Sequence, residues 1–147
     1  MVVKCRPIEN DVTLLVTTIL QNRKPLFSNP AIAREAIDTL YRVQDQHPFF
    51  LFGFVIMPDH CHLLIRVPSP GKISTVMNRW KMGVAHSIGL GPIWQSRFDA
   101  RTVHDVSEAL RYIHNNPAKA GLVEIPDNYP WSSASGKWDV QPIDNWY

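Results

Sequence analysis

The chain has 147 residues, a length that suits one domain with a hydrophobic core of its own. Hydrophobic residues make up 45% of the sequence and charged residues 19%, as in an ordinary globular protein. A formal net charge of +2 is too small to argue for nucleic-acid binding by itself.

The sequence carries no segment typical of a membrane or secreted protein. No apolar run reaches the roughly 18 residues that a membrane helix needs, and the start of the chain, Met1–Pro7, lacks the apolar stretch of a signal peptide. The two cysteines, Cys5 and Cys61, do not form a CxxC motif. We therefore expect a reduced, cytoplasmic protein without membrane contact. We find no repeat or linker, so we expect one domain over residues 1–147, with an irregular tail from about residue 122.

Hydrophobic patterning in the first half of the chain predicts strands around one helix. Runs of β-branched and apolar residues indicate the strands. Apolar residues with a helical period follow Ser28 or Asn29, either of which can cap a helix that starts with Pro30. Pro58 and Asp59 predict a turn between two of the strands. The expected elements are strands at 12–20, 49–57 and 60–67 and a helix at 30–46.

The second half predicts two more helices. They are expected at 73–88 and from Asp105 to about Pro117, with a strand or hairpin at 93–103 between them. Because a proline disfavours helical geometry in the residue before it, Asn116 is expected to be the C-cap. The order β-α-β-β-α-β-α predicts an α+β fold, a ferredoxin-like or RRM-like antiparallel sheet with the helices packed on one face.

The segment His60-Cys61-His62 begins the third expected strand. Alternate side chains of a strand share a face, so both imidazoles point the same way and Cys61 points into the opposite layer. Two histidines placed in this way can bind one divalent metal ion. The alternative is a pair of ordinary half-buried histidines.

A second group of polar residues lies near the end of the third expected helix. Tyr112 and Asn116 are four residues apart, so they share one face of that helix. A phenol beside an amide oxygen can supply a nucleophile beside a third metal ligand. The alternative for Tyr112 is a tyrosine of the core or of an interface.

These segments together resemble one family. Residues 54–65 (FVIMPDHCHLLI) are similar to the HUH segment of single-tyrosine transposases, which include the REP-associated tyrosine transposases. U stands for a hydrophobic residue, here Cys61. Further similar segments, in the order of the family, are 22–27 (NRKPLF), 93–98 (IWQSRF), 112–123 (YIHNNPAKAGLV) and 129–133 (YPWSS). The resemblance covers residues 12–133, nearly the whole chain.

The resemblance implies a metal-dependent enzyme that nicks single-stranded DNA beside hairpins or palindromic repeats through a 5′-phosphotyrosine. It implies that His60 and His62 bind Mg²⁺ or Mn²⁺, that Asn116 is the third ligand, and that Tyr112 is the nucleophile. Asp59 is expected to serve the turn and to face away from the metal. His114 is expected on the other side of its helix from Tyr112.

Basic and aromatic residues after the histidine pair are candidates for DNA contacts. Trp80 lies on the apolar stripe of its helix and is expected in the core instead. Two other functions stay open, a metal-dependent hydrolase without a tyrosine nucleophile and a non-catalytic, domesticated nucleic-acid-binding protein. A homodimer also stays open, since the family includes dimers. The candidate DNA contacts are Arg79, Lys81, Trp94, Arg97, Arg101 and Lys119.

Overall fold

The structure, a computed structural model, describes residues 12–143. Its helices and strands are β1 (Thr13–Leu20), α1 (Pro30–Gln46), β2 (Phe50–Ile56), β3 (His60–Arg66), α2 (Ile73–Ile88), β4 (Trp94–Thr102) and α3 (Val106–Lys119). Short 3-10 turns, η1 (Gln21–Arg23), η2 (Leu26–Ser28), η3 (Pro126–Asn128) and η4 (Ser133–Ser135), connect or follow them. The four strands form one antiparallel sheet in the order β2-β3-β1-β4. Within the described range, no helix is long and apolar enough to cross a membrane.

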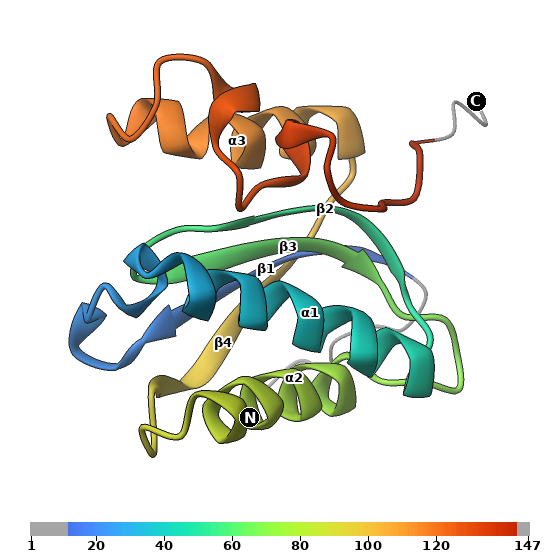
Figure 1. The fold of residues 1–147 in the computed structure, drawn as a ribbon. Coiled ribbons are helices and arrows are strands. Elements are labelled where there is room, and N and C mark those ends of the chain that lie inside the picture. Colours follow the sequence, from blue (N-terminus) through green and yellow to red (C-terminus); the bar gives the residue numbers. More distant parts are fainter. Residues whose placement is uncertain (1–11, 144–147) are drawn as a thin grey trace, which may run out of the picture.

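The predicted α+β class with a single antiparallel sheet is confirmed, and the helices divide between the two faces of the sheet. Figure 1 shows α1 and α2 side by side on one face and α3 on the other. The prediction placed every helix on one face, which holds for α1 and α2. The apolar stripe of α3 packs instead against a second buried cluster that includes Val55, Leu64 and Tyr129.

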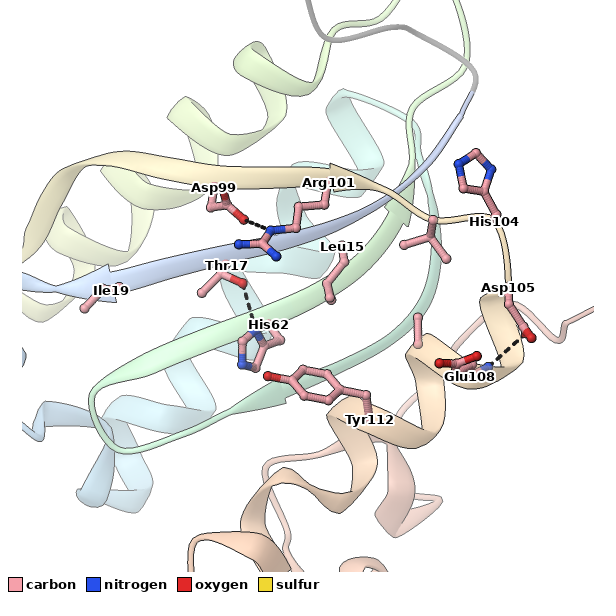
Figure 2. Close-up of a pocket in the computed structure, with 12 residues that line it drawn as sticks. Leu15, Thr17, Ile19, His62, Asp99, Arg101, His104, Asp105, Glu108 and Tyr112 are labelled. Carbon is pink, nitrogen blue, oxygen red and sulfur yellow. Dashed lines mark hydrogen bonds and ion pairs between the residues drawn. The ribbon is translucent and has the colours of Figure 1, made fainter.

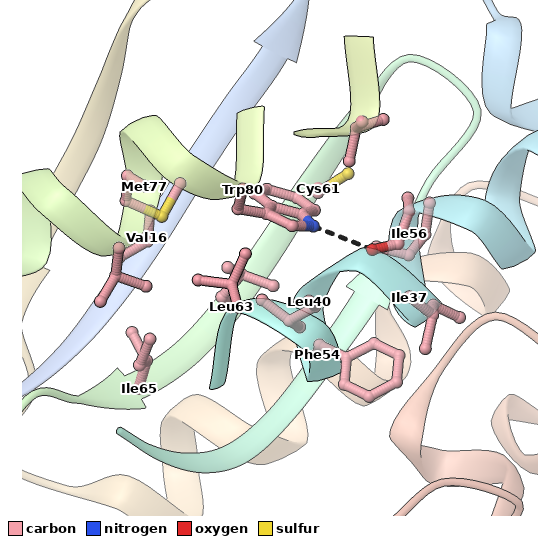
Figure 3. Close-up of a cluster of buried hydrophobic side chains, with 14 of the residues drawn as sticks. Val16, Ile37, Leu40, Phe54, Ile56, Cys61, Leu63, Ile65, Met77 and Trp80 are labelled. Carbon is pink, nitrogen blue, oxygen red and sulfur yellow. Dashed lines mark hydrogen bonds between the residues drawn. The ribbon is translucent and has the colours of Figure 1, made fainter. Parts of the chain in front are cut away.

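The larger core lies between the sheet and the pair α1 and α2. Trp80 of α2 is fully buried there, and its indole nitrogen donates a hydrogen bond of 2.8 Å to the carbonyl oxygen of Ala36 in α1 (Figure 3). This confirms Trp80 as a core residue. Cys61 and Leu63 of β3 reach the same core, so β3 turns its odd-numbered side chains toward these helices. Its even-numbered side chains face α3.

The segment after α3 holds that helix against the sheet. The hydroxyl of Tyr129 donates to the carbonyl oxygen of Ile56 at 2.7 Å, and the Ile56 amide donates to the Trp131 carbonyl at 2.8 Å. Oγ of Ser133 accepts from the amide of Phe54 at 3.0 Å and lies 2.7 Å from Nε2 of His114 in α3. The tail therefore links β2 to α3 although it contains only short 3-10 turns.

The predicted N-caps of α1 and α3 are confirmed, but the predicted C-cap of α3 is wrong. Asn29 caps α1 by accepting from the amide of Ala31, and Asp105 caps α3 by accepting from the amide of Glu108. Pro117 lies inside α3, which continues to Lys119. Proline removes one amide donor and strains the residue before it, but here the helix continues. Asn116 is therefore a helical residue and not the C-cap.

A methyl group added at Gly53 tests how closely α3 approaches β2. A Cβ atom there would overlap Cδ1 of Leu110 in α3 and lie 3.1 Å from Oγ of Ser133. We expect Gly53→Ala to lower the free energy of unfolding by about 1–3 kcal/mol, as overpacked cores do, measured by urea denaturation. Leu110→Ala removes the obstructing methyl group, so the double variant should lose less stability than the two single losses added together. Strict additivity would contradict this contact.

Candidate active site

His60 and His62 lie on the face of β3 that is turned toward α3. β3 pairs with β1 so that His62 lies opposite Thr17. The two imidazole rings meet edge to face, with their centroids 4.9 Å apart. Cys61 between them is fully buried in the core on the other face. The predicted orientation of the two histidines is confirmed.

His62 is a buried and neutral imidazole. Its side chain is only 6% exposed, and its Nδ1 lies 2.9 Å from the hydroxyl oxygen of Thr17. Burial, and then the nearby charge of His60, lower the pKa of His62 to about 4. The ring is therefore uncharged at neutral pH, which is the form that binds a metal ion.

The Nδ1 side of the His60 ring contacts Asp59, which forms an ion pair with Arg23. Its Nδ1 lies 2.7 Å from Oδ1 of Asp59, and Oδ2 of Asp59 accepts a hydrogen bond of 3.2 Å from Nη1 of Arg23. Burial acts to raise the pKa of Asp59, but the hydrogen bonds and charges of His60 and Arg23 outweigh it and lower that pKa. Asp59 is therefore an anion at neutral pH. It contacts the histidine pair, where the sequence suggested only a role in the turn.

Tyr112 reaches from α3 over the sheet toward His62 (Figure 2). The two rings lie 5.8 Å apart between centroids, at an angle of 65°. Tyr112 is 51% exposed, so a large substrate can reach its hydroxyl. Asn116 lies one helical turn further along the same face of α3, because the helix continues through Pro117.

These side chains line one cleft of about 310 Å³ between β1, β3 and α3. The residues that line it are Thr17, Ile19, Arg23, His60, His62, Tyr112, Asn116 and Lys119. It brings together the four residues predicted to carry the chemistry, from two segments about 50 positions apart in the sequence.

The donor atoms in the cleft fit a divalent metal ion. Each imidazole is hydrogen-bonded through Nδ1, and neither Nε2 has a protein partner within the described residues. In the part of the chain that the structure describes, no group of three or more histidine, cysteine or carboxylate side chains is placed to hold a metal ion, and the Asp59 carboxylate contacts Nδ1 of His60 rather than Nε2. The side chain of Asn116 is then the amide group available to complete the ligand set.

The sequence matches a known family over most of its length. Residues 10–116 match the family described as "Transposase IS200 like". The chain belongs to this transposase family. It is 30% identical over 129 residues to the REP-associated tyrosine transposase of Escherichia coli strain K12, a match that covers 82% of this chain and 75% of the relative.

Solved structures agree with this assignment. The chain superimposes on a REP-associated tyrosine transposase bound to a REP hairpin with a TM-score of 0.75 and 26% identity, over 98% of this chain and 94% of that one. A protein from Deinococcus radiodurans, 20% identical, gives a TM-score of 0.58 over 78% of this chain and 97% of that one. The second likeness supports the fold alone.

A larger cleft of about 760 Å³ continues from the first one along β4 and the start of α3. Thr17, Ile19, His62 and Tyr112 line both clefts. The larger one also carries Arg101, which forms an ion pair with Asp99 at 3.0 Å, and a helix-capping carboxylate at Asp105 (Figure 2). The two clefts thus leave an open path on both sides of Tyr112.

The predicted DNA contacts are spread over both faces of the sheet. Lys119 lines the smaller cleft and Arg101 the larger one. Arg97 is exposed on β4. Arg79 is exposed on α2, which covers the opposite face from Tyr112.

Two of the residues predicted to contact DNA, Lys81 and Trp94, form hydrogen bonds within the protein. Lys81 is 8% exposed, and its ammonium donates to the carbonyl oxygen of Gln95 at 2.9 Å. The indole nitrogen of Trp94 donates to the Lys81 carbonyl at 3.0 Å, and its ring packs 5.3 Å from that of Trp80. These contacts favour structural roles for Lys81 and Trp94 over contacts with phosphates or bases.

Sequence reasoning missed three residues that support the histidine pair, Thr17, Arg23 and Asp59. Thr17 comes from β1 and meets His62 only through the strand register. Arg23 lies in one of the segments that carry the family resemblance and has a left-handed backbone, with φ of 49°, which no local pattern indicated. Of the three, Asp59 could have been found from the sequence, because a carboxylate next to a candidate metal-binding histidine can orient that ring by a hydrogen bond.

The low pKa of His62 gives the apo protein a defined response to acid. In the unfolded chain this histidine binds its proton near pH 6.5, whereas in the folded protein it does so near pH 4. As the pH falls from about 6.5 to 4, the unfolded state therefore gains a proton first and the folded state loses stability. NMR titration of the metal-free protein should show His62 neutral at pH 5, and His62→Gln should remove this part of the acid sensitivity. Titration of His62 near pH 6.5 would show a ring open to water.

Proposed function

We propose that this protein is a metal-dependent single-stranded DNA endonuclease and strand transferase that uses Tyr112 as its nucleophile. The observation that carries this proposal is the convergence of His60, His62, Tyr112 and Asn116 on one cleft. A half-exposed phenol beside two imidazole rings is the arrangement that a metal-assisted attack on a phosphodiester needs.

His60, His62 and Asn116 would hold the metal ion. Two imidazoles and one amide oxygen leave open positions and suit Mg²⁺ or Mn²⁺. When bound, the ion supplies Lewis-acid stabilisation of the charge on the scissile phosphate. His62 supports this set, because burial keeps its ring neutral without competition from protons at physiological pH.

Tyr112 would attack the phosphorus atom through its Oη. The new bond joins Oη to phosphorus, and the bond between phosphorus and the 3′ oxygen breaks. The phenolic proton is lost to the medium and the departing 3′ oxygen gains one, so the products are a 5′-phosphotyrosine and a free 3′-hydroxyl. The ester bond retained on Tyr112 can be attacked by another 3′-hydroxyl, which would rejoin a strand without a nucleoside triphosphate.

The substrate would be single-stranded DNA beside a hairpin or palindromic repeat. The solved relative with a TM-score of 0.75 is bound to a REP hairpin. In this chain, Arg23 and Lys119 add positive charge to the cleft that holds Tyr112, and the larger cleft continues from it toward Arg101. Phosphate contacts of this kind position a strand without reading its sequence.

Removal of the Tyr112 hydroxyl tests the covalent step. Wild-type protein incubated with a labelled single-stranded hairpin and Mn²⁺ should give an adduct that survives denaturing electrophoresis, and Tyr112→Phe should give none. Because Tyr112 is exposed and its hydroxyl has no hydrogen bond to the described residues, the variant should keep its stability to within about 0.5 kcal/mol. Cleavage that persists in Tyr112→Phe would favour a metal-dependent hydrolase instead. Binding by the wild type without any adduct would favour a non-catalytic DNA-binding protein.

Two substitutions at Asn116 test the third ligand. Asn116→Ala should weaken Mn²⁺ binding by about tenfold or more, which corresponds to about 1.4 kcal/mol. Asn116→Asp should keep or strengthen it, because a carboxylate is a better ligand for a hard cation. Calorimetric titration with Mn²⁺ measures both. Asn115→Ala is the matched control, since this neighbouring amide is exposed and does not line the cleft. Wild-type affinity in both Asn116 variants would leave the metal with two protein ligands.

A further inference from the structure

Of the two histidines, only His60 contacts an ion pair, the one between Asp59 and Arg23. Asp59 is placed between His60, at 2.7 Å from Nδ1, and Arg23, at 3.2 Å from Nη1. His62 has no such partner, because its Nδ1 meets the neutral hydroxyl of Thr17. The two rings therefore line the same cleft but have chemically different hydrogen-bond partners at Nδ1.

The charge of Asp59 fixes which nitrogen of His60 carries the proton. An ionised carboxylate can only accept hydrogen bonds, so Nδ1 must be the donor. In the neutral ring, the lone pair then lies on Nε2. A hydroxyl can donate or accept, so Thr17 allows either tautomer of His62. Of these two histidines, only His60 has its tautomer set by a neighbouring carboxylate.

We propose that Asp59 and Arg23 are positioning residues that prepare His60 as a metal ligand. This inference rests on the proposed metal site. Asp59 holds the ring with its Nε2 free, and Arg23 holds the carboxylate by occupying its other oxygen. Outer partners of this kind fix ring orientation and raise the basicity of the ligand.

The backbone around Asp59 is built to hold this geometry. The carbonyl oxygen of Asp59 accepts from the amide of Leu20 at the end of β1, and that of Pro58 accepts from the amide of Phe27. The chain between these two donors passes through η1, where Asn22 and Arg23 both have left-handed backbones, with φ of 57° and 49°. Such conformations cost energy for residues other than glycine. The segment 20–27 thus folds over the turn and carries Arg23 to the carboxylate.

A substitution at Arg23 can distinguish a positioning role from a simple effect of its charge on metal binding. It lines the same cleft as the histidines, so by charge alone its removal should strengthen the binding of a divalent cation. If Arg23 acts by holding Asp59, its removal should weaken that binding. The two explanations therefore predict changes of opposite sign in Mn²⁺ affinity for Arg23→Gln.

The test measures Mn²⁺ affinity by calorimetry and the tautomer of His60 by nitrogen NMR of the metal-free protein. Asp59→Ala should weaken Mn²⁺ binding by about 10- to 100-fold and should release His60 into a mixture of tautomers. Asp59→Asn keeps a weaker, neutral acceptor and should lose less affinity. Arg23→Gln should weaken Mn²⁺ binding. The matched control is Asp38→Ala, which removes a carboxylate paired with Arg34 on α1, on the other face of the sheet, and should leave the affinity unchanged.

Two results would overturn the proposal. One is tighter Mn²⁺ binding by Arg23→Gln. The other is a fixed Nδ1–H tautomer of His60 together with unchanged affinity in Asp59→Ala, which would limit Asp59 to the turn. A wild-type protein that binds no Mn²⁺ would instead refute the metal site of the proposed function. The tautomer measurement needs no metal and would still show whether Asp59 orients the ring.

Discussion

The register between β1 and β3 is the constraint on which the site depends. It places Thr17 opposite His62 and, through the two-residue period of a strand, turns His60 to the same face. The same register sends Cys61 and Leu63 into the core beneath α1 and α2. A slip by one residue would put both imidazoles into that core and expose its apolar side chains. Core burial therefore fixes the position of the histidines, and the chemistry depends on the packing of the opposite face.

The tyrosine reaches this pair from an element with a separate support. α3 packs against its own small cluster and is linked to β2 through the tail, where Ser133 contacts both the Phe54 amide and His114. Gly53 leaves room for the helix to come close to the sheet. His114 and Tyr112 are two residues apart on α3, so one side chain anchors the helix while the other points into the cleft. The irregular tail thus fixes the position of Tyr112 relative to the histidine pair.

The elements were predictable from sequence because their hydrophobic periods are long and unambiguous. The four residues that meet in the smaller cleft could be singled out because they lie within motifs. The end of α3 was not predictable, since the effect of Pro117 depends on whether tertiary contacts hold the last turn. The contacts of Thr17 and Arg23 with the site could not be predicted from the sequence either. Thr17 meets His62 only through the strand register, and Arg23 reaches Asp59 only through a left-handed turn. Composition likewise could not show that Lys81 is buried, because a basic residue on a helix is usually solvated.

The candidate site combines a buried imidazole with an accessible tyrosine. His62 is 6% exposed and Tyr112 is 51% exposed, although their rings are neighbours. A metal ligand benefits from burial, because water and protons then compete less for its lone pair. The proposed nucleophile must be reached by a polymer from outside, and Tyr112 accordingly lines two open clefts. The two histidines also differ in burial and in their hydrogen-bond partners. The deeper His62 is kept neutral by burial, whereas the shallower His60, 19% exposed at its side chain, has a carboxylate to define its ring.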